Sequence, residues 1–283
     1  MHINMAQVLS NRSTHLAHDK VNSDLLNGVV LTNSLLKTLS SVRTSALEEV
    51  NDNAFAIVGP YGPGKSTTAL FIYQYLCGQI PDGIQKKLDH LKIDALPLKN
   101  KYNKTFILVG DNTSLNESIR EAFGLAQDVA PVLWLEKELR KGSRIAIFID
   151  EMGKYLEYAA EFPNEGDVYV LQQIAELAHR SAGKLLLVTI RHQGLIAYVS
   201  KLPTTYLNEW KKIQGRFSDL IHVNSVDESI KIIYDRLDAL GIKSTKTPPT
   251  HLELLRGNTQ ISENIIEDVL SRSYQISPQI GRA

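Results

Sequence analysis

The stretch "GPYGPGKST", Gly59 to Thr67, decides the fold predicted for this chain, because it joins a short apolar run to a helical pattern. It matches G-x-x-x-x-G-K-[ST], the Walker A pattern, whose glycines let backbone N–H groups close around phosphates at a helix N-terminus. Lys65 would reach the β- and γ-phosphates, and the Ser66 hydroxyl would bind Mg²⁺. We expect the whole loop to bind nucleotide: Gly59, Pro60, Tyr61, Gly62, Pro63, Gly64, Lys65, Ser66 and Thr67.

Short apolar runs alternate with longer amphipathic stretches along the chain. Each run is apolar on both faces, which is typical of a parallel sheet covered by helices on both sides. The expected strands are residues 54–58, 105–110, 144–149, 184–190 and 219–223, and the expected helices between them are 65–76, 116–126, 168–182 and 204–214. This alternation predicts a three-layer α/β P-loop NTPase with a five-stranded parallel sheet.

Composition restricts the class of protein. A chain of 283 residues with 43% hydrophobic content can bury a full core. Lys+Arg and Asp+Glu both total 31, so a global basic field for nucleic acid is absent. The single cysteine, Cys77, excludes an internal disulfide framework. No signal pattern or membrane-length apolar run is present, so we expect a cytoplasmic protein.

A second motif, "RIAIFIDEMGKYLEY", ends an apolar run in Asp150 and Glu151. We expect that strand to lie beside the P-loop strand, where Asp150, in the Walker B role, meets Mg²⁺ and its waters. Glu151 would orient or deprotonate the attacking water. The alternative is a pair of solvated turn acids.

The strand expected at 105–110 lies in sequence between the two motifs, as in the ATPases that carry an extra strand there (the ASCE class). In such enzymes a polar residue at its tip can hold the catalytic carboxylate in an inactive direction. Asn112 is a better neutral hydrogen-bond partner for Glu151 than Asp111 is. Either residue could instead cap a turn.

The strand expected at 184–190 delivers "TIRHQ" to the same edge of the sheet. A polar group there can contact the γ-phosphate or the attacking water. Thr189 is the first candidate, and Arg191 and His192 are alternatives, because a strand end can direct either neighbour toward the nucleotide.

The segments "VGPYGPGKS", "IDEMGKYLEYAA", "LLLVTIRHQG" and "EWKKIQGRFSDL" together resemble the N-terminal ATPase module of bacterial AAA+-type ATPases found in phage-defence islands, similar to the large ATPase of the BREX system. The resemblance covers roughly residues 50–223. It implies ATP as the nucleotide, self-assembly, and work within a multiprotein complex on DNA. Members of that group are usually far longer than this chain.

In the AAA+ arrangement, the end of the fourth helix faces the nucleotide of the neighbouring subunit, and we expect Arg216 to lie there. An arginine there neutralises charge that develops on the γ-phosphate in trans, an effect worth ~10³ to 10⁵ in rate in other enzymes. The helix before it can bury Leu207, Trp210 and Ile213. The alternative is a surface arginine or an ion pair with Asp219.

Two regions flank the predicted ATPase core, which spans residues 50–224. Residues 1–49 read as a partly helical extension in which Thr32 can cap a helix, and residues 225–283 read as a small helical lid, with a truncated lid as the alternative to a whole one. Arg282 could reach the γ-phosphate of its own chain from that lid.

A local basic segment is the one candidate for DNA contact. It contains Lys86, Lys87, Lys92, Lys99, Lys101 and Lys104. Such a segment would contact phosphates without sequence preference. A solvated connection is the alternative.

The sequence therefore predicts an ATPase that couples Mg²⁺-dependent ATP hydrolysis to remodelling of a protein or DNA-bound assembly. The alternative is a signalling-type switch or scaffold that binds ATP and hydrolyses it rarely.

Overall fold

The computed structural model describes residues 16, 26, 29–48, 51–60, 62, 64–91, 101–162, 168–198, 204–225, 228, 229 and 232. The chain divides into two compact units, Met1–Val29 with Ser34–Val223, and Val30–Asn33 with Asn224–Ala283. All five strands belong to the first unit.

The strands are β1 (Ala54–Val58), β2 (Lys104–Val109), β3 (Ile145–Asp150), β4 (Leu185–Arg191) and β5 (Ser218–Ile221). The helices are α3 (Asn33–Glu48), α4 (Lys65–Cys77), α5 (Asp82–His90), α6 (Leu115–Ala122), α7 (Pro131–Arg140), α8 (Met152–Glu161), α9 (Tyr169–Arg180), α10 (Leu195–Tyr198) and α11 (Thr204–Gln214). Every predicted strand is present, with bounds within two residues of those expected.

The sheet is parallel throughout, with the strand order β2-β3-β4-β1-β5. The predicted three-layer α/β P-loop fold is confirmed. One detail of the prediction was wrong: β3 does not lie beside β1, because β4 pairs with both strands. The P-loop strand and the acidic strand are therefore separated by two inter-strand spacings, about 9 to 10 Å.

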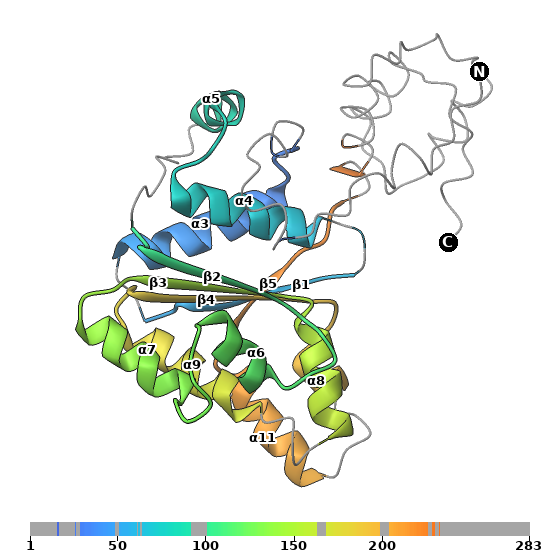
Figure 1. The fold of residues 1–283 in the computed structure, drawn as a ribbon. Helices are drawn as coiled ribbons and strands as arrows, with labels where there is room; N and C mark the ends of the chain where they lie inside the picture. The colour runs from blue at the N-terminus through green and yellow to red at the C-terminus, as the bar shows by residue number, and fades with distance from the viewer. Residues whose placement is uncertain are drawn as a thin grey trace, which may run out of the picture. The chain divides into compact units, whose positions relative to one another are not determined.

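The two faces of the sheet have different helical layers. Figure 1 shows α3 and α4 on one face and α6, α7, α8, α9 and α11 on the other. On the second face, Leu185 and Leu187 of β4 share a hydrophobic cluster with α9 and with Trp210 and Ile213 of α11. On the first face, the Tyr73 ring of α4 packs edge-on against Phe148 of β3. Because side chains alternate along a strand, this assignment tells which face each residue near the strand ends occupies.

The segments that flank the sheet are described only in part. The helix expected near the N-terminus is α3, which Thr32 directly precedes, and most of α3 belongs to the larger unit. Its first residue, Asn33, donates its backbone N–H to the Glu228 carboxylate (2.7 Å). Most of the predicted lid, including Arg282, lies outside the described residues, and the boundaries at residues 50 and 224 stay predictions.

Candidate active site

The P-loop connects the end of β1 to the start of α4. Gly62 and Gly64 adopt left-handed backbone conformations, with φ of 92° and 89°. Successive backbone turns of this kind direct N–H groups into a concavity that suits an anion, and only glycine adopts them without strain. Tyr61 and Pro63 lie outside the described residues. The described part of the loop therefore has the bend that phosphate binding requires.

Gly59 is required for a different reason. A Cβ atom at this position would lie 2.1 Å from the His222 carbonyl oxygen. The His222 N–H in turn donates to the Val58 carbonyl (2.7 Å) as the chain leaves β5. The first glycine of the motif thus allows close packing of β5 against the base of the loop.

Lys65 is the first residue of α4 and is only 5% exposed. Its Nζ donates a 2.5 Å hydrogen bond to the Pro60 carbonyl, inside the loop. Burial lowers the pKa of Lys65, and the negative charge of Asp150 opposes that shift. Lys65 therefore interacts both with the loop, through the Pro60 carbonyl, and with Asp150 at the end of β3, through its charge.

Asp150 ends β3 and is 4% exposed. Its Oδ1 accepts the backbone N–H of Glu151 (2.8 Å). Phe148 faces α4, so alternation directs Asp150 toward the same face, on which the P-loop helix lies. The structure thus brings Lys65 and Asp150 together across the end of β4.

Glu151 has a left-handed backbone (φ 48°, ψ 37°) at the start of α8, which is uncommon for a residue other than glycine. Such strain is concentrated at functional sites. The half-exposed carboxylate forms an ion pair with Lys154 (2.5 Å). Asn112 is exposed, and its backbone N–H donates to Asp111 Oδ1 (2.8 Å), which is the turn-capping alternative. Between the described residues Asn112 and Glu151 there is no hydrogen bond, so the predicted restraint by Asn112 is not confirmed.

Thr189 lies inside the sheet and is 1% exposed. Its Oγ1 donates to the Phe55 carbonyl of β1 (3.3 Å). Leu185 and Leu187 face the α9 side, so alternation directs Thr189 away from α4. The structure therefore does not support Thr189 as the γ-phosphate contact.

The two alternatives to Thr189 have different surroundings. The Arg191 side chain is buried, forms a short ion pair with Asp219 of β5, and lies near the Phe217 ring. His192 lies in the bend that follows β4. Burial lowers the pKa of His192, the positive charge of Lys65 lowers it further, and Glu151 opposes both effects. Of these candidates, His192 is the one that lies near Lys65 and Glu151.

Arg216 lies at the amino ends of the strands, opposite the ends that carry the P-loop and Asp150, and it comes shortly before β5. Its carbonyl accepts a hydrogen bond from His179 Nε2 (2.7 Å), and the other ring nitrogen of His179 contacts the Asn51 carbonyl ahead of β1. The guanidinium pairs with Glu176 of α9 (3.1 Å), not with Asp219. The length of β1, about 16 Å, separates these two ends of the strands. Arg216 therefore cannot reach a nucleotide in its own P-loop.

Two residues near Glu151 had no role in the sequence analysis. Lys154 lies within the motif at residues 144–158, and its pairing with Glu151 requires that a helix begin directly after Glu151, as α8 does. Gly110 follows β2, and a Cβ there would lie 2.0 Å from the Glu151 carbonyl oxygen. The pattern of a glycine directly after an apolar strand run was the available signal for such a close approach.

The basic segment proposed for DNA contact is only partly available for that role. Lys86 and Lys87 are exposed on α5, whereas Lys92 and Lys99 lie outside the described residues. Lys104 pairs with Glu138 (2.5 Å) and lies over the Trp134 ring (5.2 Å).

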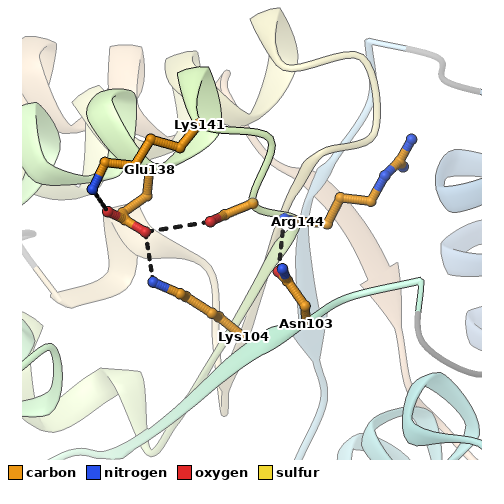
Figure 2. A network of polar contacts seen from close by, with 6 residues as sticks. Asn103, Lys104, Glu138, Lys141 and Arg144 are labelled. Atoms are coloured by element: carbon orange, nitrogen blue, oxygen red, sulfur yellow. Dashed lines mark hydrogen bonds and ion pairs between the residues drawn. The ribbon is translucent and has the colours of Figure 1, made fainter.

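Glu138 is the centre of that network, shown in Figure 2. Its carboxylate lies between the ammonium groups of Lys104 and Lys141, the latter at 2.7 Å. The hydrogen bond from Lys104, the larger effect, and the one from Lys141 together lower the pKa of Glu138 to about 2. Lys104 therefore has an internal structural partner.

Comparison with known proteins gave similarity in shape alone. No protein-family model matches the chain, and no curated protein does. Two archaeal structures are similar: the ORC2 protein of Aeropyrum pernix in ADPNP–ADP complexes (12% identity, TM-score 0.44, covering 85% of this chain and 68% of that one), and Cdc6p of Pyrobaculum aerophilum (13% identity, TM-score 0.39, covering 84% and 54%). This chain therefore spans about half the length of the second. Among the described residues, no helix is long and apolar enough to cross a membrane.

Proposed function

We propose that this chain binds ATP with Mg²⁺ and hydrolyses its β–γ phosphoanhydride bond, as an AAA+-type ATPase. The observation that carries the proposal is the electrostatic coupling of Lys65 and Asp150 next to a loop with two left-handed glycines. A buried cation and a buried carboxylate at one sheet edge suit the phosphates and the metal ion of a nucleotide, respectively.

The residues present fit the cofactor. Ser66 and Asp150 would hold Mg²⁺, which neutralises the charge of the phosphate oxygens when it is bound. When nucleotide binds, Lys65 gives up its hydrogen bond to the Pro60 carbonyl and donates to a phosphate oxygen instead. Glu151 takes the proton of the attacking water, and the nearby His192 contacts the γ-phosphate or that water.

Two substitutions test this function against simple misfolding. Lys65→Ala should abolish ATP binding, because the buried cation is lost. Glu151→Gln should retain ATP binding and stop turnover, because the amide cannot accept the proton. Binding is measured by isothermal titration calorimetry and turnover by phosphate release. Normal hydrolysis by Glu151→Gln would remove that residue from the mechanism.

Arg216 is proposed to act on the nucleotide of a second copy of the chain. The support is its position at the sheet edge opposite its own P-loop and its exposed side chain. The ATPase rate per chain should then rise with protein concentration, and Arg216→Ala should bind ATP normally yet hydrolyse it at least tenfold more slowly. A variant as fast as the parent would exclude this role.

The finer proposal follows the resemblance to ATPases of phage-defence islands: hydrolysis drives rearrangement of a cytoplasmic protein assembly on DNA. Lys86 and Lys87, both exposed on α5, are the candidates for phosphate contact. A rise in the ATPase rate with duplex DNA that disappears at high salt supports DNA as a partner.

A nucleotide-dependent switch that hydrolyses rarely is the second candidate. The observation that favours it is the engagement of the Glu151 carboxylate by Lys154. A chain that purifies with bound nucleotide and shows a low rate, independent of concentration, would favour the switch over the remodelling ATPase.

A further inference from the structure

The carboxylate of Glu151 is paired with an ammonium group on its own helix. Lys154 lies three residues later on α8, and its Nζ is 2.5 Å from Glu151 Oε2. The hydrogen bond to Glu151 is the main cause of a raised pKa of Lys154, and the charges of Asp111 and Glu157 add to it. Negative groups from two elements therefore keep Lys154 charged next to the base.

The backbone of Glu151 is fixed on every side. Its N–H donates to Asp150 Oδ1, and its carbonyl accepts the Lys154 N–H (3.0 Å). Gly110 packs so close to that carbonyl that no larger residue fits. The direction of the carboxylate therefore depends on the side-chain torsions of Glu151. In this structure the ion pair with Lys154 holds the carboxylate along α8.

An ion pair of this kind restrains a general base through its geometry. The pair holds the carboxylate on one partner, whereas catalysis requires contact with the attacking water. Both groups are half exposed, so the restraint is modest and can be broken.

Resting on the function proposed above, we propose that Lys154 is a positioning residue that holds Glu151 in a resting direction and limits the rate of ATP hydrolysis. ATP binding does not depend on this pair, because Lys65 and the P-loop are separate from it. Loss of Lys154 therefore acts on kcat and leaves nucleotide affinity unchanged.

The first test detects the pair without any ATPase measurement. Limiting amine acetylation followed by mass spectrometry compares Lys154 with Lys137, an exposed lysine on α7. In the parent, Lys154 should react more slowly than Lys137, because its amine is held protonated by Glu151. Glu151→Gln should raise the reactivity of Lys154 several-fold and leave Lys137 unchanged. Equal reactivity of Lys154 in both proteins would overturn the proposal.

The second test separates positioning from structure. Lys154→Met should raise kcat about two- to fivefold with unchanged KM, as expected for release of an exposed ion pair, and Lys154→Arg should stay near the parent. Arg140→Met is the matched control, because it breaks the exposed pair with Glu136 on α7 (3.7 Å) and should leave kcat unchanged. An unchanged or lower kcat in Lys154→Met would overturn the proposal. A parent that binds no ATP would refute the proposed function, while the acetylation result still decides whether Glu151 holds Lys154.

Discussion

Gly110→Ala is expected to impair catalysis more than stability. The added Cβ would lie 2.0 Å from the Glu151 carbonyl oxygen, whereas ordinary contact begins at 3.4 Å. The backbone of Glu151 must therefore move by about 1.4 Å, or the end of β2 must move away by that distance. Overpacking of this kind costs about 1–3 kcal/mol of unfolding free energy. For a domain of this size, that loss lowers Tm by about 2 to 12 °C. A displacement of about 1 Å in a catalytic group can reduce kcat by about 10²-fold.

The assay compares Tm, ATP affinity and kcat in the parent, Gly110→Ala and Gly83→Ala. Gly83 is the matched control, since a Cβ there has nothing within 4 Å and the residue lies in helix α5. The control should be as active as the parent. ATP affinity should be retained in Gly110→Ala, because the P-loop is on a different strand. If Gly110→Ala had the parent's Tm and kcat, the close approach of β2 to Glu151 would have no functional meaning.

Three further changes test individual contacts. Because the folded-state pKa of Glu138 is lowered to about 2, its ionised form stabilises the fold above the unfolded value of about 4.3, and that contribution is lost as the pH falls from there toward 2. Urea unfolding should therefore show Glu138→Gln to be less stable than the parent at pH 7, with a difference that shrinks below pH 4; a difference independent of pH would contradict the ion-pair account. Thr189→Val should lose about 1 kcal/mol of stability with the hydrogen bond to Phe55, yet keep its kcat in phosphate-release assays. His192→Ala should bind ATP but lose on the order of 10²-fold in kcat, and a parent-like rate would exclude it from the site.

The sequence was sufficient to predict the sheet, because the three central strands β1, β3 and β4 are almost entirely apolar and buried, and the edge strands β2 and β5 still contain short apolar runs. It also located the two motifs relative to the elements, since Asp150 ends β3 and Lys65 begins the helix after the loop that follows β1. Strand order was harder to predict. Parallel strands with helical connections carry no local signal of which neighbour each will have, so the placement of β4 between β1 and β3 needed the structure.

The choice at the tip of β4 shows where periodicity alone was insufficient. The strand was expected to end at residue 190, but it ends at Arg191. Which face Thr189 occupies depends on which side of the sheet carries the P-loop helix, and that is a tertiary property. The Thr189 hydroxyl is engaged by its hydrogen bond to the Phe55 carbonyl. His192 instead lies near Lys65 and Glu151.

The pairing of Lys154 with Glu151 could not be predicted, because no pattern after Glu151 marks the start of α8. A salt bridge between residues three apart requires a helix at that point. The arginine at 216 illustrates the opposite case. Its expected ion-pair partner, Asp219, is close in sequence, but burial of Arg191 gives that acid another partner, so Arg216 pairs with Glu176.

The position of β4 also determines how accurately the site can be aligned. Asp150 and the P-loop are carried by strands that share no hydrogen bond with each other, so their mutual alignment depends on two ladders that meet in β4. A slip of one residue in either ladder would shift the acid along the strands by about 3.3 Å and turn it to the opposite face. The buried bond from Thr189 to β1 helps to fix one of these registers. The pairing of β4 with both neighbours therefore determines the position of Asp150 relative to the P-loop, even where β4 itself contributes no catalytic group.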